Sequence, residues 1–536
     1  AGVLNIGTFT ANRASAGGTL TVAGTLQLGS NTGGQTGSNF PANFSSVVLT
    51  GGTVEYTRAG TQTVYGGATY NNLSLFGSGA KTFGATTTIN GNLAINSGVT
   101  ATLGTFTHSA NSITLAGNGQ PSGSYGGTGS GATYILTTYF TAATGKINVS
   151  TGSCVSGTWL GNVSTDWNTA SNWCGAAVPT SSTDVVIPSG TAFAPTIASG
   201  TTAVCRDITI NTGATLTLAN SATSLLNVSG DFDNDGTLTQ GASSKISFVG
   251  NVAQNIFGNS TTSFTNLTIS NNTAAVSISV NINVSGTFSV GTGAIVTPAA
   301  TTVINSSAAA GTISGTGTVQ VTRITATADY SNQYKFTTNT LSSITVDYAG
   351  AGAQTINAFT YGSLSTSGSG TKTMGGTVVV NNTATVGAGT TLDENTRTMT
   401  IAGGGSLVVN GTLDFTSSTG LIQSGTSGTS TLTMGSTGTI RTIDPLGIGP
   451  VANASFVTQA GGAWSMSSIA GNGTVEYYIN SATGVITDMD YNNLTITGTS
   501  FAKTWTPGSA RTVNGTVTIA GNFTIAGSQT INVKGD

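Results

Sequence analysis

The chain contains few residues of the types that catalyse reactions. His108 is the single histidine, and the stretch around it, "GTFTHSANS", holds no cysteine or acidic residue. We interpret it as a lone surface histidine on a strand. Hydrolysis of a glycosidic bond needs two carboxyl groups that flank that bond. The candidate acids are few and scattered: Asp347, Asp393, Glu394, Asp414, Glu476, Asp488 and Asp490. We therefore predict that the protein is not an enzyme.

One stretch has the residue types of a calcium loop. "DFDNDG", residues 231–236, reads D-x-D-x-D-G, which is how such loops begin. The glutamate expected at loop position twelve is Ala242, and polar-apolar alternation continues through the stretch. Two interpretations stay open: a strand-turn-strand with the turn at Asn-Asp-Gly, or a weak calcium site formed by Asp231, Asp233 and Asp235. No other cofactor is expected.

Three cysteines lie within one short window, at Cys154, Cys174 and Cys205. Because the number is odd, at most one internal bridge can form and one thiol is left over. Their spacing contains no C-x-x-C metal pair. We predict a single disulfide between Cys174 and Cys205 in an exported protein, with Cys154 left over.

The composition excludes several classes of function. Charged residues make up 6% of the chain and the net charge is -3, so no basic surface can neutralise phosphates and nucleic-acid binding is disfavoured. The sequence contains no run of 18 apolar residues, so it predicts no membrane-spanning helix. The opening residues "AGVLNIGTFT" have no signal-peptide pattern, so an exported protein would be represented here by a mature or excised chain.

Alternation of apolar and polar residues dominates the sequence. "TLTVAGTLQL" places Leu20, Val22, Leu26 and Leu28 on alternating positions, and similar runs recur throughout. This period of two, bounded by Gly and Asn-Gly, is the signal of β-strands. Gly, Thr, Ser and Asn are poor helix formers. Because 37% of the residues are hydrophobic, the chain is expected to fold rather than stay disordered. The sequence predicts an all-β protein.

A repeat with two aromatic residues occurs four times. The first aromatic closes a short strand, the second follows 13 to 16 residues later, and a leucine comes three residues after the second. The four pairs are Tyr56 with Tyr70, Phe248 with Phe264, Tyr348 with Tyr361, and Tyr477 with Tyr491. In three copies a lysine follows, at Lys81, Lys372 and Lys503. The intervals between copies are uneven.

Two β architectures can hold such a repeat. Tandem β-sandwiches would want regular turn signals and a separate core for each domain. A parallel β-helix, or β-solenoid, requires short strands with one face inward, tight Gly and Asn turns, and stacked similar residues. It also tolerates uneven intervals, because each coil touches only its neighbours and insertions bulge outwards. We predict an elongated parallel β-solenoid and keep tandem β-sandwiches as the alternative.

The pattern divides the chain into three segments. Residues 1–153 form a first solenoid segment that ends in a Gly/Ser-rich loop and an aromatic strand pair. Residues 154–190 hold Trp159, Trp167 and Trp173 and are predicted to be a compact junction or cap. Residues 191–536 form a second solenoid segment, with repeats near 244–296, 342–392 and 473–525.

Several stretches resemble a known group of proteins. "TWLGNVSTDWNTASNWCGAAVPTSSTDVVIP" with "CRDITINTGATLTL" downstream, "GAGAQTINAFTYGSLSTSGSGTKTMGG" and "GNGQPSGSYGGTGSGATYILTTYFTAATGKINV" are similar to segments of very large secreted surface proteins of Bacteroidota. The resemblance implies export by the type IX system and display at the cell surface as adhesin, gliding-adhesin or fibre material.

Two features of the repeat have alternative interpretations. Tyr70 and Tyr491 each begin a Tyr-Asn-Asn-Leu sequence. They could stack on sugar rings beside amide groups, or they could simply cover the side of the solenoid. The repeat lysines could make lateral contacts, or they could protect exposed strand edges.

These observations predict an extracellular structural or adhesive protein that forms a stiff rod and can assemble into a fibre or surface layer. Its expected partners are other copies of itself or other cell-surface components, with glycans as a further candidate. A carbohydrate-binding adhesin is the first alternative. An ice-binding solenoid with Thr-x-Thr rows is the second, although it requires one uniform coil face, which the irregular spacing disfavours.

Overall fold

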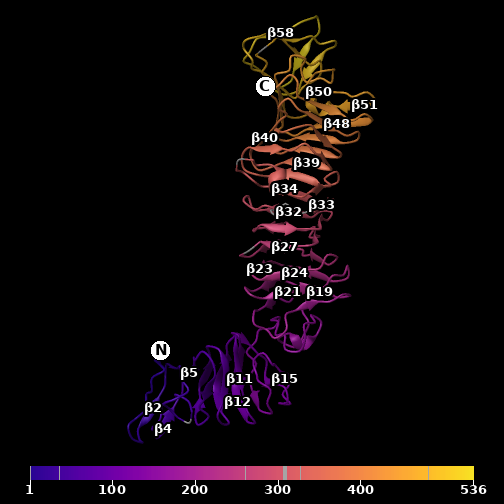
Figure 1. Cartoon of the computed structure of the whole chain (residues 1–536). Helices are drawn as coiled ribbons and strands as arrows, with labels where there is room; N and C mark the ends of the chain where they lie inside the picture. Colours follow the sequence, from indigo (N-terminus) through magenta and orange to yellow (C-terminus); the bar gives the residue numbers. More distant parts are fainter. Residues whose placement is uncertain are drawn as a thin grey trace. The chain divides into compact units, whose positions relative to one another are not determined.

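A computed structural model describes residues 2–35, 37–259, 261–305, 311–325, 327–480 and 482–535. The chain divides into two compact units, Ala1–Ser244 and Lys245–Asp536. In each unit short strands pair in parallel from one coil to the next, and the coils follow one another in Figure 1. The predicted all-β parallel solenoid is confirmed, and the alternative of tandem β-sandwiches is wrong.

Before the junction, the first unit contains one long sheet and two small ones. The long sheet has the order β1 (Val3–Gly7), β3 (Thr25–Leu28), β5 (Thr53–Tyr56), β8 (Asn72–Leu75), β10 (Thr88–Ile95), β12 (Thr107–Leu115), β16 (Lys146–Val149), β14 (Gly123–Gly126) and β15 (Tyr134–Ile135), with β7 (Thr69–Tyr70) beside β10 and β13 (Asn118–Gly119) beside β12. The small sheets are β6 (Gln62–Val64), β9 (Gly79–Phe83) and β11 (Val99–Thr102), and β2 (Thr19–Thr21) with β4 (Ser46–Val48).

The antiparallel pairs in this unit lie at the end of the long sheet. β13 runs antiparallel to β12, and β14 runs antiparallel to β16. Both strands come from the Gly/Ser-rich stretch between β12 and β16, and β16 itself pairs in parallel with β12. β15 pairs in parallel with β14 and is the last strand on the path of the long sheet.

After the junction the first unit contributes strands to three further parallel sheets. They are β17 (Val185–Ile187), β20 (Ile208–Ile210) and β23 (Phe232–Asn234); β18 (Thr196–Ile197), β21 (Thr215–Leu218) and β24 (Thr237–Gln240); and β19 (Thr202–Cys205) with β22 (Leu225–Val228). The junction itself has a single 3-10 turn, η1 (Ala170–Asn172), and isolated bridges.

In the second unit each coil contributes strands to different parallel sheets. The largest contains β26 (Gln254–Phe257), β29 (Val276–Ile278), β32 (Ile295–Pro298), β34 (Thr318–Val321), β36 (Thr345–Tyr348), β39 (Ser363–Thr366), β42 (Thr383–Val386), β45 (Ser406–Val409), β48 (Gly428–Met434) and β51 (Gly462–Ser465). A second contains β37 (Gln354–Ile356), β40 (Gly370–Met374), β43 (Thr390–Asp393), β46 (Thr412–Phe415), β49 (Thr439–Thr442), β52 (Thr474–Tyr477), β54 (Asn493–Ile496) and β57 (Val517–Ile519).

The remaining strands of this unit complete the other sides of the coils. They are β25 (Lys245–Phe248), β28 (Leu267–Ile269), β31 (Thr287–Val290), β33 (Thr312–Gly315) and β35 (Thr338–Asn339); β38 (Thr360–Tyr361), β41 (Val378–Val380), β44 (Thr398–Ile401), β47 (Leu421–Ser424) and β50 (Phe456–Val457); β27 (Thr262–Phe264) and β30 (Ile282–Val284); β53 (Gly484–Ile486), β55 (Lys503–Trp505) and β58 (Phe523–Ile525); and β56 (Arg511–Val513) with β59 (Ile531–Val533). The short helices are α1 (Tyr330–Gln333) and η2 (Ser467–Ala470).

Helices contribute little to the described residues. The α-helix there has four residues, and no helix in those ranges has the length and apolar character needed to cross a membrane.

The core of the second unit is a set of side-chain ladders. Along the largest sheet one inward position is filled in consecutive coils by apolar residues, each of which is buried. This ladder consists of Val346, Leu364, Ala384, Leu407 and Leu432. The residues on either side point outwards because side chains alternate along a strand. Uneven repeat intervals are therefore compatible with an unbroken core.

Turns between strands need glycine at particular positions. Gly368 separates β39 from β40 with φ of +72°, in the left-handed region that favours glycine. A Cβ at this position would lie 2.5 Å from the carbonyl oxygen of Ala349 in the preceding coil. Both the left-handed backbone of this turn and the carbonyl group of the preceding coil therefore disfavour a side chain at Gly368.

The predicted boundary near residue 153 corresponds to a change of sheet. Strands up to Val149 and strands from Val185 onwards belong to different sheets inside the first unit. The division into compact units lies elsewhere, after Ser244. The domain limits at residues 153 and 190 therefore stay a prediction.

The ladder makes a testable prediction about stability. Replacing Leu407 by Ala is expected to lower the free energy of unfolding by about 2–5 kcal/mol, because it leaves a cavity between Ala384 and Leu432. Urea denaturation followed by circular dichroism measures this change. The control is Thr385→Ala on the outward side of β42, which should change stability by less than about 0.5 kcal/mol. Equal effects of the two substitutions would contradict the assigned inward face.

Candidate functional site

The repeat aromatics all lie in the core. Each of the eight predicted repeat aromatics has an exposed fraction of 2% or less. They are Tyr56, Tyr70, Phe248, Phe264, Tyr348, Tyr361, Tyr477 and Tyr491. Tyr70 and Tyr491 therefore cannot serve as a surface platform for sugars. Of the two interpretations of Tyr-Asn-Asn-Leu, the packing role is confirmed and the sugar platform is wrong.

Each tyrosine pair forms a closed ring of hydrogen bonds. In the third copy the hydroxyl groups of Tyr348 and Tyr361 lie 3.2 Å apart. The backbone N–H of Asn357 donates to the Tyr348 oxygen at 3.0 Å, and the Tyr361 hydroxyl donates to the carbonyl oxygen of the same Asn357 at 2.6 Å. Both polar groups of one backbone residue are thus satisfied inside the core, as burial requires.

The same ring recurs in two other copies. Tyr56 and Tyr70 enclose Tyr65, with hydroxyl oxygens 3.0 Å apart. Tyr477 and Tyr491 enclose Thr487, with hydroxyl oxygens 2.9 Å apart. Burial raises the pKa of these six phenols, so they stay neutral.

The remaining copy replaces both tyrosines. Phe248 and Phe264 have no hydroxyl groups and cannot form the ring. Both members of the pair have changed together, as expected for two groups that act as one hydrogen-bonded unit. The pair is therefore a structural module, and its aromatic volume is the part shared by all four copies.

The repeat lysines are buried, which differs from the predicted role at strand edges or in lateral contacts. Lys81, Lys372 and Lys503 have no exposed surface. The Lys372 ammonium group donates to the carbonyl oxygens of Gly350 at 2.6 Å and Gly352 at 3.0 Å. Those glycines lie in the preceding coil, so Lys372 ties two coils together.

Lys81 and Lys503 occupy similar positions. Lys81 donates to the carbonyl oxygens of Arg58 and Gly60 at 2.6 and 2.9 Å. Lys503 donates to the carbonyl oxygens of Gly498 and Phe501. Burial lowers the pKa of Lys81 and of Lys372 to about 8, and it also lowers the pKa of Lys503.

A glutamine completes this lysine position in the third copy. The Gln354 side-chain oxygen accepts from Lys372 at 2.7 Å and from the Gly350 N–H at 3.1 Å. In the second copy Asn271 replaces the lysine, and its amide donates to Val252 and to the Gln254 side chain. A neutral amide can therefore fill the position that an ammonium fills elsewhere.

The calcium candidate lies on a strand. Phe232 and Asn234 of β23 are buried, whereas Asp231, Asp233 and Asp235 alternate with them on the other face. Successive residues on one face of a strand are about 6.6 Å apart, which spreads the three carboxyl groups out. Burial, with a contribution from Asp235, raises the pKa of Asp233. Of the two interpretations, the backbone matches the strand-turn-strand.

More generally, no group of three or more His, Cys, Asp and Glu side chains within the described ranges could hold a metal ion.

The disulfide joins Cys154 to Cys174, so the predicted bridge between Cys174 and Cys205 is wrong. The Cα atoms of the bridged pair are 5.9 Å apart. Cys205 is a free, fully buried thiol on β19, in register with Val228 of the next coil, and burial raises its pKa. The two bridged cysteines instead lie on irregular segments that the junction folds together. Spacing along the chain does not contain this information.

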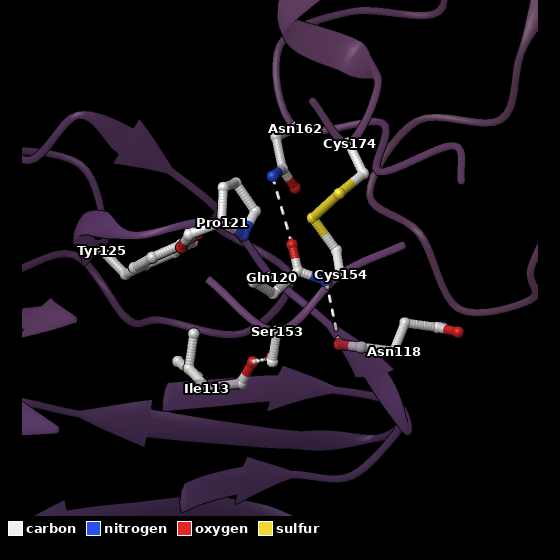
Figure 2. The surroundings of a disulfide bond; sticks show 9 residues. All are labelled: Ile113, Asn118, Gln120, Pro121, Tyr125, Ser153, Cys154, Asn162 and Cys174. Atoms are coloured by element: carbon white, nitrogen blue, oxygen red, sulfur yellow. Dashed lines mark hydrogen bonds between the residues drawn. A yellow bond between two sulfur atoms is a disulfide. The ribbon is translucent and has the colours of Figure 1, made fainter. Parts of the chain in front are cut away.

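Figure 2 shows how the disulfide lies beside the end of the first solenoid segment. Gln120 is buried there, and its side chain accepts from Asn162 at 3.2 Å and donates to the carbonyl oxygen of Asn118 at 3.0 Å. The same view places Ser153, next to Cys154, against Ile113 of β12. Side-chain contacts thus link the junction to the last coil before it.

The junction has its own aromatic core, as predicted. Trp173 packs edge-on against Trp159 and Trp167, with ring centroids 4.9 and 4.7 Å away. The Trp173 indole donates to the carbonyl oxygen of Trp167 at 2.7 Å. The side-chain oxygen of Asn172, also buried, accepts from the N–H groups of Val163 and Ser164. These contacts replace strand pairing in this segment.

His108 is buried, so the prediction of a surface histidine is wrong. The backbone N–H of Thr87 donates to its Nδ1 at 3.1 Å, and Nε2 lies 3.2 Å from the carbonyl oxygen of Leu103. These partners require the proton on Nε2. Phe83 packs on the ring with centroids 4.7 Å apart, and burial lowers the histidine pKa. A neutral structural histidine fits these contacts.

Some of the scattered acids meet on one outward ladder of the second unit. Arg441 lies between Asp414 and Glu476 and pairs with them at 2.8 and 2.7 Å. Its guanidinium also lies 4.4 Å from the centroid of the Tyr478 ring. An arginine inserted between the carboxylates removes their repulsion, so the ladder stabilises three adjacent coils.

Glu394 is a buried acid with a structural role. Its carboxylate accepts from the N–H groups of Thr396 at 2.7 Å and Ser417 at 3.1 Å, the latter on the following coil. Burial raises the pKa of Glu394 to about 7. Gly420 leaves the necessary space, because a Cβ there would lie 1.4 Å from the carboxylate.

The burial of these polar groups in the core was not predicted from the sequence. The Tyr pairs, the buried lysines and Glu394 lie in strands or turns whose alternation is ordinary. Their signal was the recurrence of residue types in the copies, in particular a glutamine six residues after the first aromatic at Gln62, Gln254 and Gln354. That recurrence indicates a common role and does not by itself distinguish burial from exposure.

Part of the chain is similar to a known family. Residues 158–255 match a family described as Domain of unknown function (DUF8693). This part of the chain contains the tryptophan cluster and the strands that follow the junction. No curated protein and no solved structure matches the chain.

The disulfide assignment can be tested by peptide mapping. Cleavage before Asp166 and Asp184 separates the three cysteines, and without reductant we expect the peptide with Cys154 to be linked to the peptide with Cys174. Cys205 should react with iodoacetamide only after unfolding, because it is buried. The change Cys154→Ser is expected to cost about 3 kcal/mol of stability. A linked pair of Cys174 and Cys205 would overturn the assignment.

The tyrosine ring predicts a coupled effect of two substitutions. Tyr348→Phe leaves the N–H of Asn357 without its acceptor and is expected to cost about 1–3 kcal/mol of unfolding free energy. Tyr348→Phe with Tyr361→Phe should cost less than the sum of the two single changes, since both belong to one ring. Chemical denaturation measures all three variants, with Tyr134→Phe as the part-exposed control. Strict additivity would show that the ring does not act as a unit.

Proposed function

We propose that this protein is a non-catalytic structural component whose coils form a stiff rod outside the cell. The observation that carries the proposal is the unbroken ladder of buried side chains from coil to coil, with Lys81, Lys372 and Glu394 bonded across coil boundaries. Such stacking makes stability a sum over neighbouring coils, so length can be added without a new core.

Display outside the cell is supported by two observations. The disulfide between Cys154 and Cys174 is of the kind that persists in oxidising surroundings. The sequence resemblance to large secreted surface proteins of Bacteroidota favours export by the type IX system and a role as adhesin or fibre material. Other cell-surface components are the expected partners.

End-to-end self-association extends this proposal. In the last described coil, β57 and β58 expose Ile519 by 54% and Ile525 by 49%, although both occupy inward positions. Their partners one coil earlier, Ile496 and Trp505, are buried. Covering such a side chain is worth about 1.5–3 kcal/mol. A coil of a second copy that stacks here would continue the ladder in fibres or a surface layer.

The outward surface does not favour the ice-binding alternative. Its hydroxyl rows are interrupted by Val408 on β45 and by the charged ladder around Arg441. A uniform face is what that function requires.

Negative-stain microscopy and sedimentation velocity test the rod and its assembly. We expect elongated particles that lengthen with concentration. Ile519→Asp with Ile525→Asp should reduce the lengthening at least about tenfold, because a charge would be buried at the contact. The matched control, Thr518→Asp with Thr524→Asp, changes outward positions of the same strands and should assemble normally. Round particles would refute the rod, whereas rods of one length at all concentrations would refute only the assembly.

A further inference from the structure

A polar hollow lies on the first unit, where β10 follows the strand of Tyr70. Its volume is about 380 Å³, and three consecutive residues from each of three neighbouring coils line it. The lining comes from residues 88–90 on β10, 109–111 on β12, and 148–150 at the end of β16. A register irregularity between Ile89 and Asn92 interrupts the pairing of β10 with β12 beside the hollow. The volume lies in the range of small-molecule sites.

The middle residue of each triplet points into the core. Ile89, Ala110 and Val149 are aligned in register and buried. Because side chains alternate along a strand, the flanking residues project outwards and form two rows with backbone between them. These rows consist of Thr88, Asn90, Ser109, Asn111, Asn148 and Ser150.

The two rows keep unused hydrogen-bonding capacity. Among the described residues, the amide groups of Asn90 and Asn148 have no hydrogen-bond partner, and both side chains are exposed. The Asn111 side-chain oxygen accepts from Ser150 at 3.3 Å and Thr151 at 3.0 Å, which fixes that amide. The lining therefore offers free amide donors and acceptors beside hydroxyl groups, in a frame set by the sheet.

The charge of the lining selects the class of ligand. None of the nine lining residues is charged. Phosphorylated, sulfated or acidic ligands would find no counter-charge here. A sugar hydroxyl is both a donor and an acceptor, as amide and hydroxyl side chains together require. Successive strands are about 4.8 Å apart, so a ligand laid across them meets a fresh pair of polar residues at each coil.

We propose that this hollow is a binding site for a neutral oligosaccharide. The oligosaccharide crosses β10, β12 and β16, and its hydroxyl groups bond to the amides of Asn90, Asn111 and Asn148. The site goes beyond the structural role of the rod, because it supplies a ligand for the surface that the rod displays. The open, solvated contact predicts weak affinity for one site, with a dissociation constant on the order of 1 mM.

Saturation-transfer NMR with the 536-residue chain tests the proposal. The probes are neutral trisaccharides of glucose and of xylose, each at up to about 10 mM, with a trigalacturonate as the acidic comparison. We expect transfer to at least one neutral trisaccharide and none to the trigalacturonate. Asn90→Ala with Asn148→Ala should reduce the signal at least fivefold.

The matched control is Asn382→Ala with Asn472→Ala. These asparagines are also exposed, belong to the second unit and are not among the residues that line the hollow, so the control should bind like the unchanged protein. Absence of transfer to every neutral probe would overturn the proposal, and so would equal signals from the two double variants. Transfer to the trigalacturonate alone would show that the ligand class is wrong. The rod proposal is unaffected by each of these results, because particle shape is measured separately.

Discussion

The structure depends on one constraint: each strand must pair in parallel and in register with its counterpart one coil away. A shift of one residue would turn every apolar side chain of that strand to the outside. In-register pairing places Val346, Leu364, Ala384, Leu407 and Leu432 in one buried line, although the intervals between them differ. Differences in coil length are absorbed in the turns, which face solvent and keep their backbone groups hydrated. The same constraint aligns outward residues, which is why Asp414, Arg441 and Glu476 meet on one ladder.

Buried polar groups add specificity that apolar ladders lack. A leucine ladder keeps its apolar face inward after a shift of two residues, whereas a Tyr348 hydroxyl that must meet both Tyr361 and the backbone of Asn357 tolerates one register. The same holds for Lys372, whose ammonium must reach two glycine carbonyls of the preceding coil. Each such group is costly if it is left without partners, so a misregistered coil is penalised. The copy with Phe248 and Asn271 keeps the shapes and uses neutral groups, which shows that the module varies within limits.

Much of the fold follows from the sequence because alternation is a local signal. Leu26 and Leu28 could be assigned to an inward face from their spacing alone, and both are buried. The side-chain partners could not be assigned in this way. Lys81 and His108 are residues that usually lie at surfaces. In the core, Lys81 donates to a carbonyl oxygen of the preceding coil and His108 accepts from the Thr87 N–H of the preceding coil. Cys154 was likewise predicted to be unpaired. This prediction failed because the approach of Cys154 to Cys174 depends on the irregular path of the junction. Contacts made through turns and loops are set by tertiary packing, which alternation does not encode.

The junction between Cys154 and Asp184 shows what is needed where coil stacking stops. This segment has isolated bridges and one 3-10 turn in place of paired strands, so it lacks the ladders that hold the coils. The disulfide, the cluster around Trp173 and the buried amide of Asn172 are concentrated there. A cross-link acts chiefly by restricting the unfolded chain, and it contributes most where few native contacts oppose disorder. The coils are therefore stabilised by contacts that recur from one coil to the next, and the interruption by a disulfide and an aromatic cluster of its own.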